Sequence, residues 1–107
     1  MVSAGNTAAN DGAPATAAMI PVSGTDANDA LASWSSYGSY VALSAPGTSI
    51  WTTAYNGGYT TMSGTSFSAP MTAGVIALMM SANPSLSAGQ VESLLYASAK
   101  DLGAAGR

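Results

Sequence analysis

One segment of the chain, residues 66–82, predicts an α-helix that is apolar almost all the way around. Its central run from Val75 to Met80 contains no charged or polar side chain. A helix without a polar face belongs inside a larger body, because water would otherwise meet apolar side chains on every side. A chain of 107 residues that holds such a helix therefore needs most of its other elements, or a partner, to cover it.

The rest of the chain predicts short strands, a hairpin and a second helix. The predicted strands are residues 2–4, 19–23, 41–44, 50–54 and 59–62. Pro21 is expected to place its strand at a sheet edge or a bulge. Asn56-Gly57-Gly58 joins the last two strands and predicts a hairpin turn, because these residues accept positive φ.

A capping box begins the second predicted helix, in which Ser87 is followed three residues later by Gln90. Val91, Leu94 and Leu95 fall on one side of this helix, so we expect an amphipathic helix on the surface. Together with the strands, these elements predict mixed α and β structure.

Charge and residue counts exclude several functions. Only 7% of the residues are charged, and two of these are basic, whereas an ordinary soluble domain carries about 25%. Two cations cannot follow a phosphate backbone, which excludes nucleic acid as a partner. The absence of Cys excludes thiolate catalysis and Cys-ligated zinc. There is no His either, so any mechanism that needs an imidazole must take it from outside this chain.

No targeting or membrane segment is expected. The first residues lack the basic region and the long apolar stretch of a signal peptide. The apolar run at residues 75–80 is too short to span a bilayer. We therefore expect no membrane partner.

The segment from Ser63 to Pro70 carries the chemistry. It places Ser66 between Gly-Thr and the start of the apolar helix, where unpaired N–H groups and the positive end of the helix dipole suit a developing oxyanion. Gly64 lets another backbone approach closely. Taken alone, the same pattern is also typical of a helix start that Ser or Thr merely caps.

Residues 64–70, G-T-S-F-S-A-P, closely resemble the nucleophile motif of the subtilisin-like serine proteases, the subtilases. Three further segments resemble this family in the right order: Ser3–Asn6, the end of the strand with the oxyanion-hole asparagine; Ser33–Gly38, an aromatic loop; and Ala45–Gly47, an A-P-G turn. The resemblance covers essentially the whole chain. It implies that residues 1–107 are one unit, the C-terminal part of a subtilase catalytic domain.

The fold class that the resemblance implies is α/β, a truncated subtilisin-like fold. Short strands and a hairpin would precede a buried nucleophile helix and then an amphipathic helix. Whether the shortened chain keeps the sheet order of the family, or instead rearranges or swaps elements, is left open.

Transferred to this chain, the resemblance implies that Ser66 is the nucleophile. The side-chain amide of Asn6 and the backbone N–H of Ser66 would bind the oxyanion. Ala4, Gly5 and Gly64 would contact the substrate, with the loop from Asn10 to Pro14 completing one wall of the pocket. Taken alone, Asn6 after Gly5 is also an ordinary left-handed turn residue.

The chain departs from the family in its proton carriers. The catalytic Asp and His of subtilases belong to the amino-terminal half of the domain, which we expect to be missing here, and Met71 stands where many members have a noncatalytic His. Lys100 and the five carboxylates are the remaining candidates for a base. No cofactor is expected. No metal is expected either, because residues 40–42, where some members carry a cation-binding carboxylate, contain no acid.

Three functions remain open. The first is a fragment of a secreted subtilisin-like endopeptidase, which would cleave peptides only with its missing amino-terminal half. The second is a stand-alone serine hydrolase for small or activated esters, since an alkoxide leaving group needs less help than an amine. The third is a noncatalytic module. The uncovered apolar helix predicts a homo-oligomer.

Overall fold

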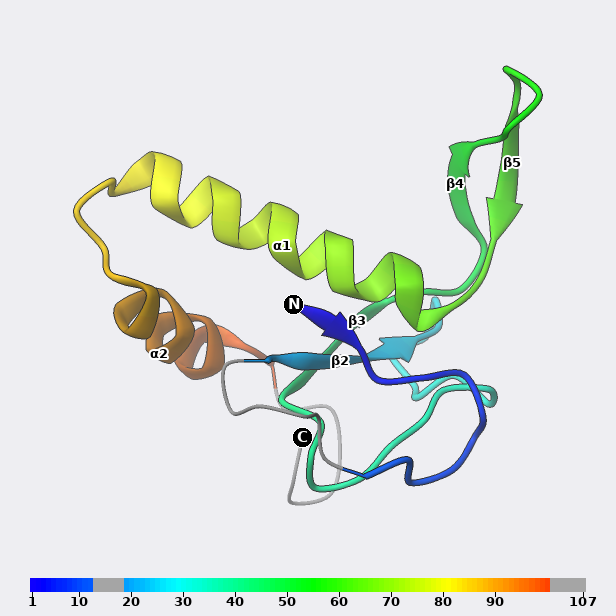
Figure 1. Ribbon diagram of the computed structural model, residues 1–107, viewed down its shortest axis with the longest axis horizontal. Helices are drawn as coiled ribbons and strands as arrows, with labels where there is room; N and C mark the ends of the chain where they lie inside the picture. The colour runs from blue at the N-terminus through cyan, green and yellow to red at the C-terminus, as the bar shows by residue number, and fades with distance from the viewer. Residues whose placement is uncertain (13–18, 101–107) are drawn as a thin grey trace.

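The computed structural model describes residues 1–12 and 19–100. These residues form a small α/β body with a hairpin that projects from it (Figure 1). The elements in chain order are β1 (Val2–Ser3), β2 (Pro21–Thr25), β3 (Leu43–Pro46), β4 (Ile50–Thr53), β5 (Tyr59–Met62), α1 (Thr65–Ala82) and α2 (Ala88–Ser98).

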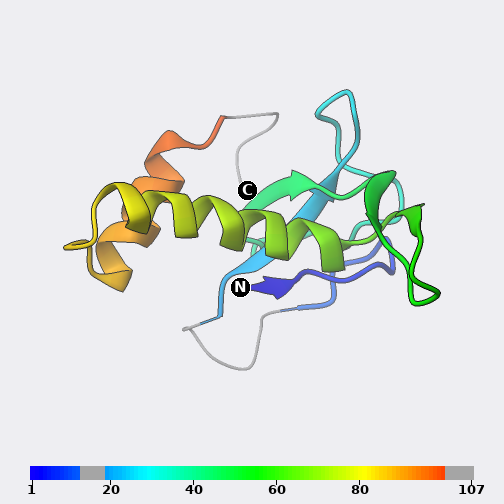
Figure 2. The ribbon, with the colours of Figure 1, turned by 90° about the horizontal axis from the view of Figure 1, so that it is seen from above.

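Three parallel strands form the sheet that carries the site. Their order is β1-β2-β3, with Val2 opposite Pro21 and Val22 opposite Leu43. Strand β2 lies in the middle and all five of its residues are buried, as is usual for a strand with neighbours on both sides. Helix α1 crosses one face of this sheet and packs against all three strands (Figure 2).

The expectation that Pro21 places its strand at an edge or a bulge is wrong. Pro21 is the first residue of β2, the central strand. A proline is tolerated at the first position of a strand because the ladder does not need its N–H there. Its carbonyl still accepts a hydrogen bond of 2.9 Å from the N–H of Ala42. Strand β3 also begins two residues later than predicted, at Leu43 rather than at residue 41.

The hairpin agrees with the sequence pattern. Strands β4 and β5 pair antiparallel, with Ile50 opposite Met62 and Thr53 opposite Tyr59. Gly57 has a φ of 85°, as the turn requires. Trp51 and Tyr59 stack on this hairpin with ring centroids 5.8 Å apart.

Helix α1 begins one residue before the predicted start and is buried only over its first two turns. Thr65, Ser68, Ala69 and Thr72 are buried, whereas Val75 is 48% and Leu78 72% exposed. The cause is length: an 18-residue helix is about 27 Å long, whereas a five-residue strand spans about 17 Å. The helix therefore extends beyond the sheet, and the prediction of a buried helix fails for its C-terminal half.

By length and composition, α1 also meets the requirements of a membrane-spanning helix. Its 18 residues have a mean hydropathy of 1.2, and 22% of them are buried. The apolar run at residues 75–80 is only part of this helix and is too short by itself to meet these requirements. Core helices of soluble proteins meet the same requirements of length and hydropathy, and the absence of a membrane partner stays a prediction.

Helix α2 starts at the predicted capping box. The N–H of Gln90 donates to Ser87 Oγ at 3.2 Å, and the N–H of Ser87 donates to Gln90 Oε1 at 2.8 Å. Val91 and Leu95, one turn apart, are buried, but Leu94 is 49% exposed. The predicted apolar face of this helix is therefore narrower than the sequence pattern indicated.

Candidate active site

Ser66 is the second residue of α1, at the end of the helix that lies beside the carboxyl ends of the parallel strands (Figure 1). Its side chain is exposed. Within the described residues, neither its hydroxyl nor its backbone N–H makes a hydrogen bond. An unpaired N–H in the first turn of a helix is available to a ligand. Ser66 thus presents a hydroxyl and a free donor at the same point.

Thr65 fixes the side chain of Asn6. Both the backbone N–H and the hydroxyl of Thr65 donate to Asn6 Oδ1, at 2.9 and 2.8 Å. The same hydroxyl accepts a bond of 3.2 Å from the N–H of Gly5. Thr65 is completely buried, so water does not compete for these bonds. Because Oδ1 is occupied, the Asn6 amide nitrogen is the part of the side chain that remains free to donate.

Gly64 has no side chain at a point that lies close to two nitrogen atoms and to the Phe67 ring. A Cβ atom added at Gly64 would lie 3.4 Å from Asn6 Nδ2 and 3.8 Å from the backbone nitrogen of Ser66. The backbone N–H of Gly64 donates to the carbonyl of Gly47 at 2.8 Å, which holds this position against the end of β3. Two nitrogen donors therefore lie within 4 Å of one point, and a pair of converging N–H donors is what an oxyanion requires.

Ala4 and Gly5 connect β1 to Asn6. Ala4 is 7% exposed, and its carbonyl accepts a hydrogen bond of 2.9 Å from Tyr40 Oη. Its side chain therefore belongs to the core, and contact between Ala4 and a substrate stays a prediction. Gly5 has a φ of 119°, and its carbonyl accepts a bond of 2.9 Å from the N–H of Ser36.

The loop at residues 10–14, predicted to complete the pocket wall, is only partly described, because residues 13 and 14 lie outside the described residues. An open hollow of about 640 Å³ lies elsewhere, on the surface of α2. It is lined by Leu86, Ser87, Gly89, Gln90, Ser93 and Leu94, and none of these was predicted to contact a substrate.

We expect Gly5→Ala to lower the free energy of unfolding by about 2–4 kcal/mol, from overpacking and from positive φ. The added Cβ would lie 2.5 Å from Asp11 Oδ2 and 2.8 Å from Ser36 Oγ. These two atoms are hydrogen-bonded to each other, so neither can move freely. Urea unfolding measures the effect. Gly12→Ala is the matched control, since Gly12 has a φ of 84° but a Cβ added there meets no atom of the described residues within 4 Å. It should cost about 1 kcal/mol, and equal losses at both positions would contradict the packing argument.

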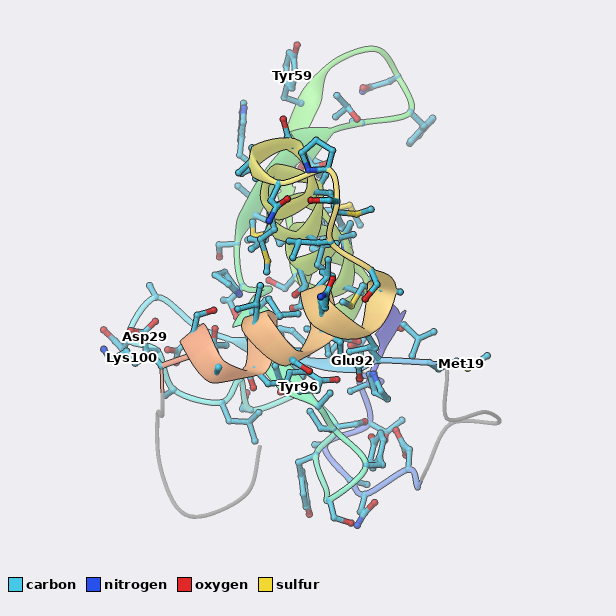
Figure 3. All side chains as sticks on the ribbon, turned by 90° about the vertical axis from the view of Figure 1, so that its left-hand side faces the viewer. Met19, Asp29, Tyr59, Glu92, Tyr96 and Lys100 are labelled. Atoms are coloured by element: carbon cyan, nitrogen blue, oxygen red, sulfur yellow. The ribbon has the colours of Figure 1, made fainter. Side chains whose placement is uncertain are left out.

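The charged groups of the described residues are engaged away from Ser66. Lys100 pairs with Asp29 at 3.8 Å on the surface (Figure 3), which gives no support to a Ser66–Lys100 dyad. Asp11 accepts hydrogen bonds from the hydroxyls of Ser36 and Thr7, which lower the pKa of its carboxyl group. Among the described residues, no base contacts the Ser66 hydroxyl.

No three His, Cys, Asp or Glu side chains of the described residues come together as they would around a metal ion. At residues 40–42, Tyr40 uses its hydroxyl to bind the Ala4 carbonyl. Burial raises the pKa of this tyrosine, and the negative charge of Asp11 raises it further.

Sequence analysis did not single out Thr65, Ser36 or Asp11. Thr65 was visible only as the residue before the predicted nucleophile, and it contacts residues about 60 positions earlier in the chain. Asp11 is one of the five carboxylates considered as a base and lies in the loop from Asn10 to Pro14, but no pattern links it to Asn6. Of the predicted site residues, Asn6, Gly64 and Ser66 lie close to one another. Gly5 immediately precedes Asn6 in the chain, and its N–H binds the Thr65 hydroxyl.

Comparison with known proteins identifies the family of this chain. Residues 1–107 match the model of the subtilase family. Alkaline serine exoprotease A of Vibrio alginolyticus is 42% identical over 102 residues, which are 92% of this chain and 19% of that protein. Subtilisin DY of Bacillus licheniformis is 41% identical over 85 residues, 79% of this chain and 31% of that protein. Other matching proteins are named as extracellular proteases.

The crystal structure of a cold adapted subtilisin-like serine proteinase matches the fold with a TM-score of 0.83 and 40% identity, over 91% of this chain and 37% of that one. The predicted subtilisin-like α/β fold is therefore confirmed. The chain spans well under half of the length of each of these three proteins.

Proposed function

Because this chain belongs to the subtilase family, we propose that residues 1–107 are part of the catalytic domain of a secreted subtilisin-like serine endopeptidase. In this proposal the chain contributes the nucleophile and the oxyanion hole, and peptides are the substrates. The proposal of secretion rests on the relatives that are named as extracellular proteases.

The observation that carries the proposal is the space in front of Gly64. Asn6 Nδ2 and the N–H of Ser66 border it, and the hydroxyl of Ser66 belongs to the same residue as the second donor. When Ser66 Oγ attacks a peptide carbonyl, the carbonyl oxygen becomes an anion that both donors can stabilise. Gly64 has no side chain that would fill the position of the oxyanion. Gly5 directly precedes Asn6 in the chain.

The proton of the Ser66 hydroxyl needs an acceptor, and none of the described residues places a base against this hydroxyl. A serine hydroxyl without a base is a weak nucleophile, and the chain contains no His. In subtilases the His and Asp come from the amino-terminal part of the domain, so we propose that such a segment completes the site. The His would take the proton from Ser66 and later give it to the leaving amine.

A phosphonofluoridate label tests this proposal. We expect the label on Ser66 when the chain is mixed with an amino-terminal subtilase segment that carries the catalytic Asp and His. Ser66→Ala should remain unlabelled in the same mixture. Rapid labelling of Ser66 in the chain alone, with cleavage of a small ester, would favour a stand-alone hydrolase instead. No labelling in either sample would favour a noncatalytic module.

The apolar surface of α1 supports a proposal about partners. Met71, Val75, Leu78 and Met80 are each at least 40% exposed. Met71, Val75 and Leu78 share one side of the helix because they lie at i, i+4 and i+7, and an exposed apolar patch marks an interaction site. We propose that the amino-terminal segment covers it in the complete domain, and that a second copy of the chain covers it when that segment is absent.

We expect the isolated chain to elute as a homo-oligomer at micromolar concentration in size exclusion with light scattering. Leu78→Glu should shift it toward the monomer, because the charge would have to be buried in the interface. Tyr55→Glu is the matched control, since Tyr55 is fully exposed on the hairpin turn, away from α1, and it should change nothing. A monodisperse wild-type monomer would rule out self-association.

A further inference from the structure

Asp11 closes the loop that carries Asn6. Its two carboxylate oxygens accept hydrogen bonds from the Thr7 hydroxyl at 2.8 and 2.9 Å. The Ser36 hydroxyl also donates to Asp11 Oδ2. Ser36 Oγ in turn accepts a bond of 3.2 Å from the backbone N–H of Thr7. One carboxylate thus ties the residue after Asn6 to a buried serine of a distant loop.

Gly5, the residue before Asn6, is held by Ser36 and packs against Asp11. The N–H of Ser36 donates to the carbonyl of Gly5 at 2.9 Å. The distance of 2.5 Å from Asp11 Oδ2 to a Cβ added at Gly5 indicates that the carboxylate packs directly against the Gly5 α-carbon. Asn6 therefore lies between two clamps. Ser36 and Asp11 hold its neighbours Gly5 and Thr7, and Thr65 holds its side-chain oxygen.

We propose that Asp11 is a positioning residue for the Asn6 amide. Its carboxylate binds the hydroxyls of Thr7 and Ser36, and Ser36 binds the backbone of Gly5 and Thr7, so that Asn6 Nδ2 stays directed at the point in front of Gly64. Asp11 does not touch the reacting atoms and acts only through Asn6. The catalytic meaning of this role rests on the proposed function, whereas the link between Asp11 and Asn6 does not.

The proposal has a pH dependence with a defined sign. The hydrogen bonds from Ser36 and Thr7 lower the pKa of Asp11 from its usual 3.8. A carboxylate with a lowered pKa in the folded state stabilises that state above its unfolded pKa, and this stability is lost as the pH falls through the folded pKa. Tyr40 is the one titratable group of the described residues that faces Asp11. It titrates above 10, so it does not contribute in acid.

The test is a ¹⁵N–¹H correlation spectrum of the isolated chain, recorded as a function of pH, with the Asn6 side-chain amide as the probe. We expect the Asn6 signals to shift in one step with a midpoint below 3.8. In Asp11→Asn the signals should already be displaced at neutral pH, and the step should be absent. Asp26→Asn is the matched control: Asp26 also binds loop N–H groups, those of Asn28 and Ala30, and its loss should leave the Asn6 step unchanged.

Thr7→Val provides a second variant that keeps the carboxylate. It removes one hydroxyl that binds Asp11, so the midpoint of the Asn6 step should move upward, toward 3.8. An Asn6 signal that does not shift with pH, or one that shifts identically in Asp11→Asn, would overturn the proposal. This outcome is independent of the proposed function. Ser66 labelling can fail while the pH step of the Asn6 signal still depends on Asp11, and labelling can succeed while the Asn6 signal is unaffected by Asp11.

Discussion

Replacing Ser66 by alanine is expected to lower the peptidase turnover of the recombined protein by about 10⁶-fold, a magnitude taken from subtilisin itself. The recombined protein is this chain together with an amino-terminal segment that carries the Asp and His. Ser66 supplies the only hydroxyl proposed to form a covalent bond with the substrate, and the oxyanion hole alone leaves only a small residual rate. Turnover of a chromogenic peptide measures the loss.

Ser68→Ala is the matched control for this experiment. Ser68 lies two residues further along α1, and its hydroxyl is buried with no hydrogen-bond partner in the described residues. Removing such a hydroxyl costs little and can stabilise a protein, so activity should be retained. Loss of activity in Ser68→Ala together with full activity in Ser66→Ala would exclude Ser66 as the nucleophile.

The second large effect is expected at Asn6. Asn6→Ala should lower kcat of the recombined protein by about 10²–10³-fold, again a magnitude known from subtilisin. KM should change little, because the amide acts on the charge that develops in the transition state. Steady-state kinetics separates the two parameters.

Asn6→Asp distinguishes the donor from the structural role of this side chain. Aspartate keeps an oxygen that can accept both hydrogen bonds from Thr65, but it replaces the amide donor by an anion. We expect kcat to fall at least as far as in Asn6→Ala while the unfolding free energy stays closer to the wild-type value. Wild-type kcat in Asn6→Asp would contradict the proposed oxyanion hole.

The sequence predicts elements whose signals are local. The capping box at Ser87 and Gln90, the turn at Asn56-Gly57-Gly58 and the start of α1 each depend on residues close together in the chain. The structure agrees with all three. The motif around Ser66 was informative for the same reason, because seven consecutive residues carry it.

The predictions that fail concern properties that depend on residues far apart in the chain. Pro21 seemed to require an edge strand, but its place at the first position of the central strand depends on which strands pair with it. The clamp that Asp11, Ser36 and Thr65 form around Asn6 joins residues 25 to 60 positions apart. No local pattern indicates such contacts. The exposure of Leu78 follows from the lengths of the sheet and helix, which no single motif contains.

Peptide hydrolysis by the purified chain, measured with and without the amino-terminal segment, tests the central claim most directly. The claim is that this chain holds a nucleophile and its oxyanion donors but no proton carrier, since it contains no His. We predict no hydrolysis above background for the chain alone and hydrolysis that depends on Ser66 in the mixture. Rapid cleavage of peptides by the chain alone, abolished in Ser66→Ala, would contradict the claim.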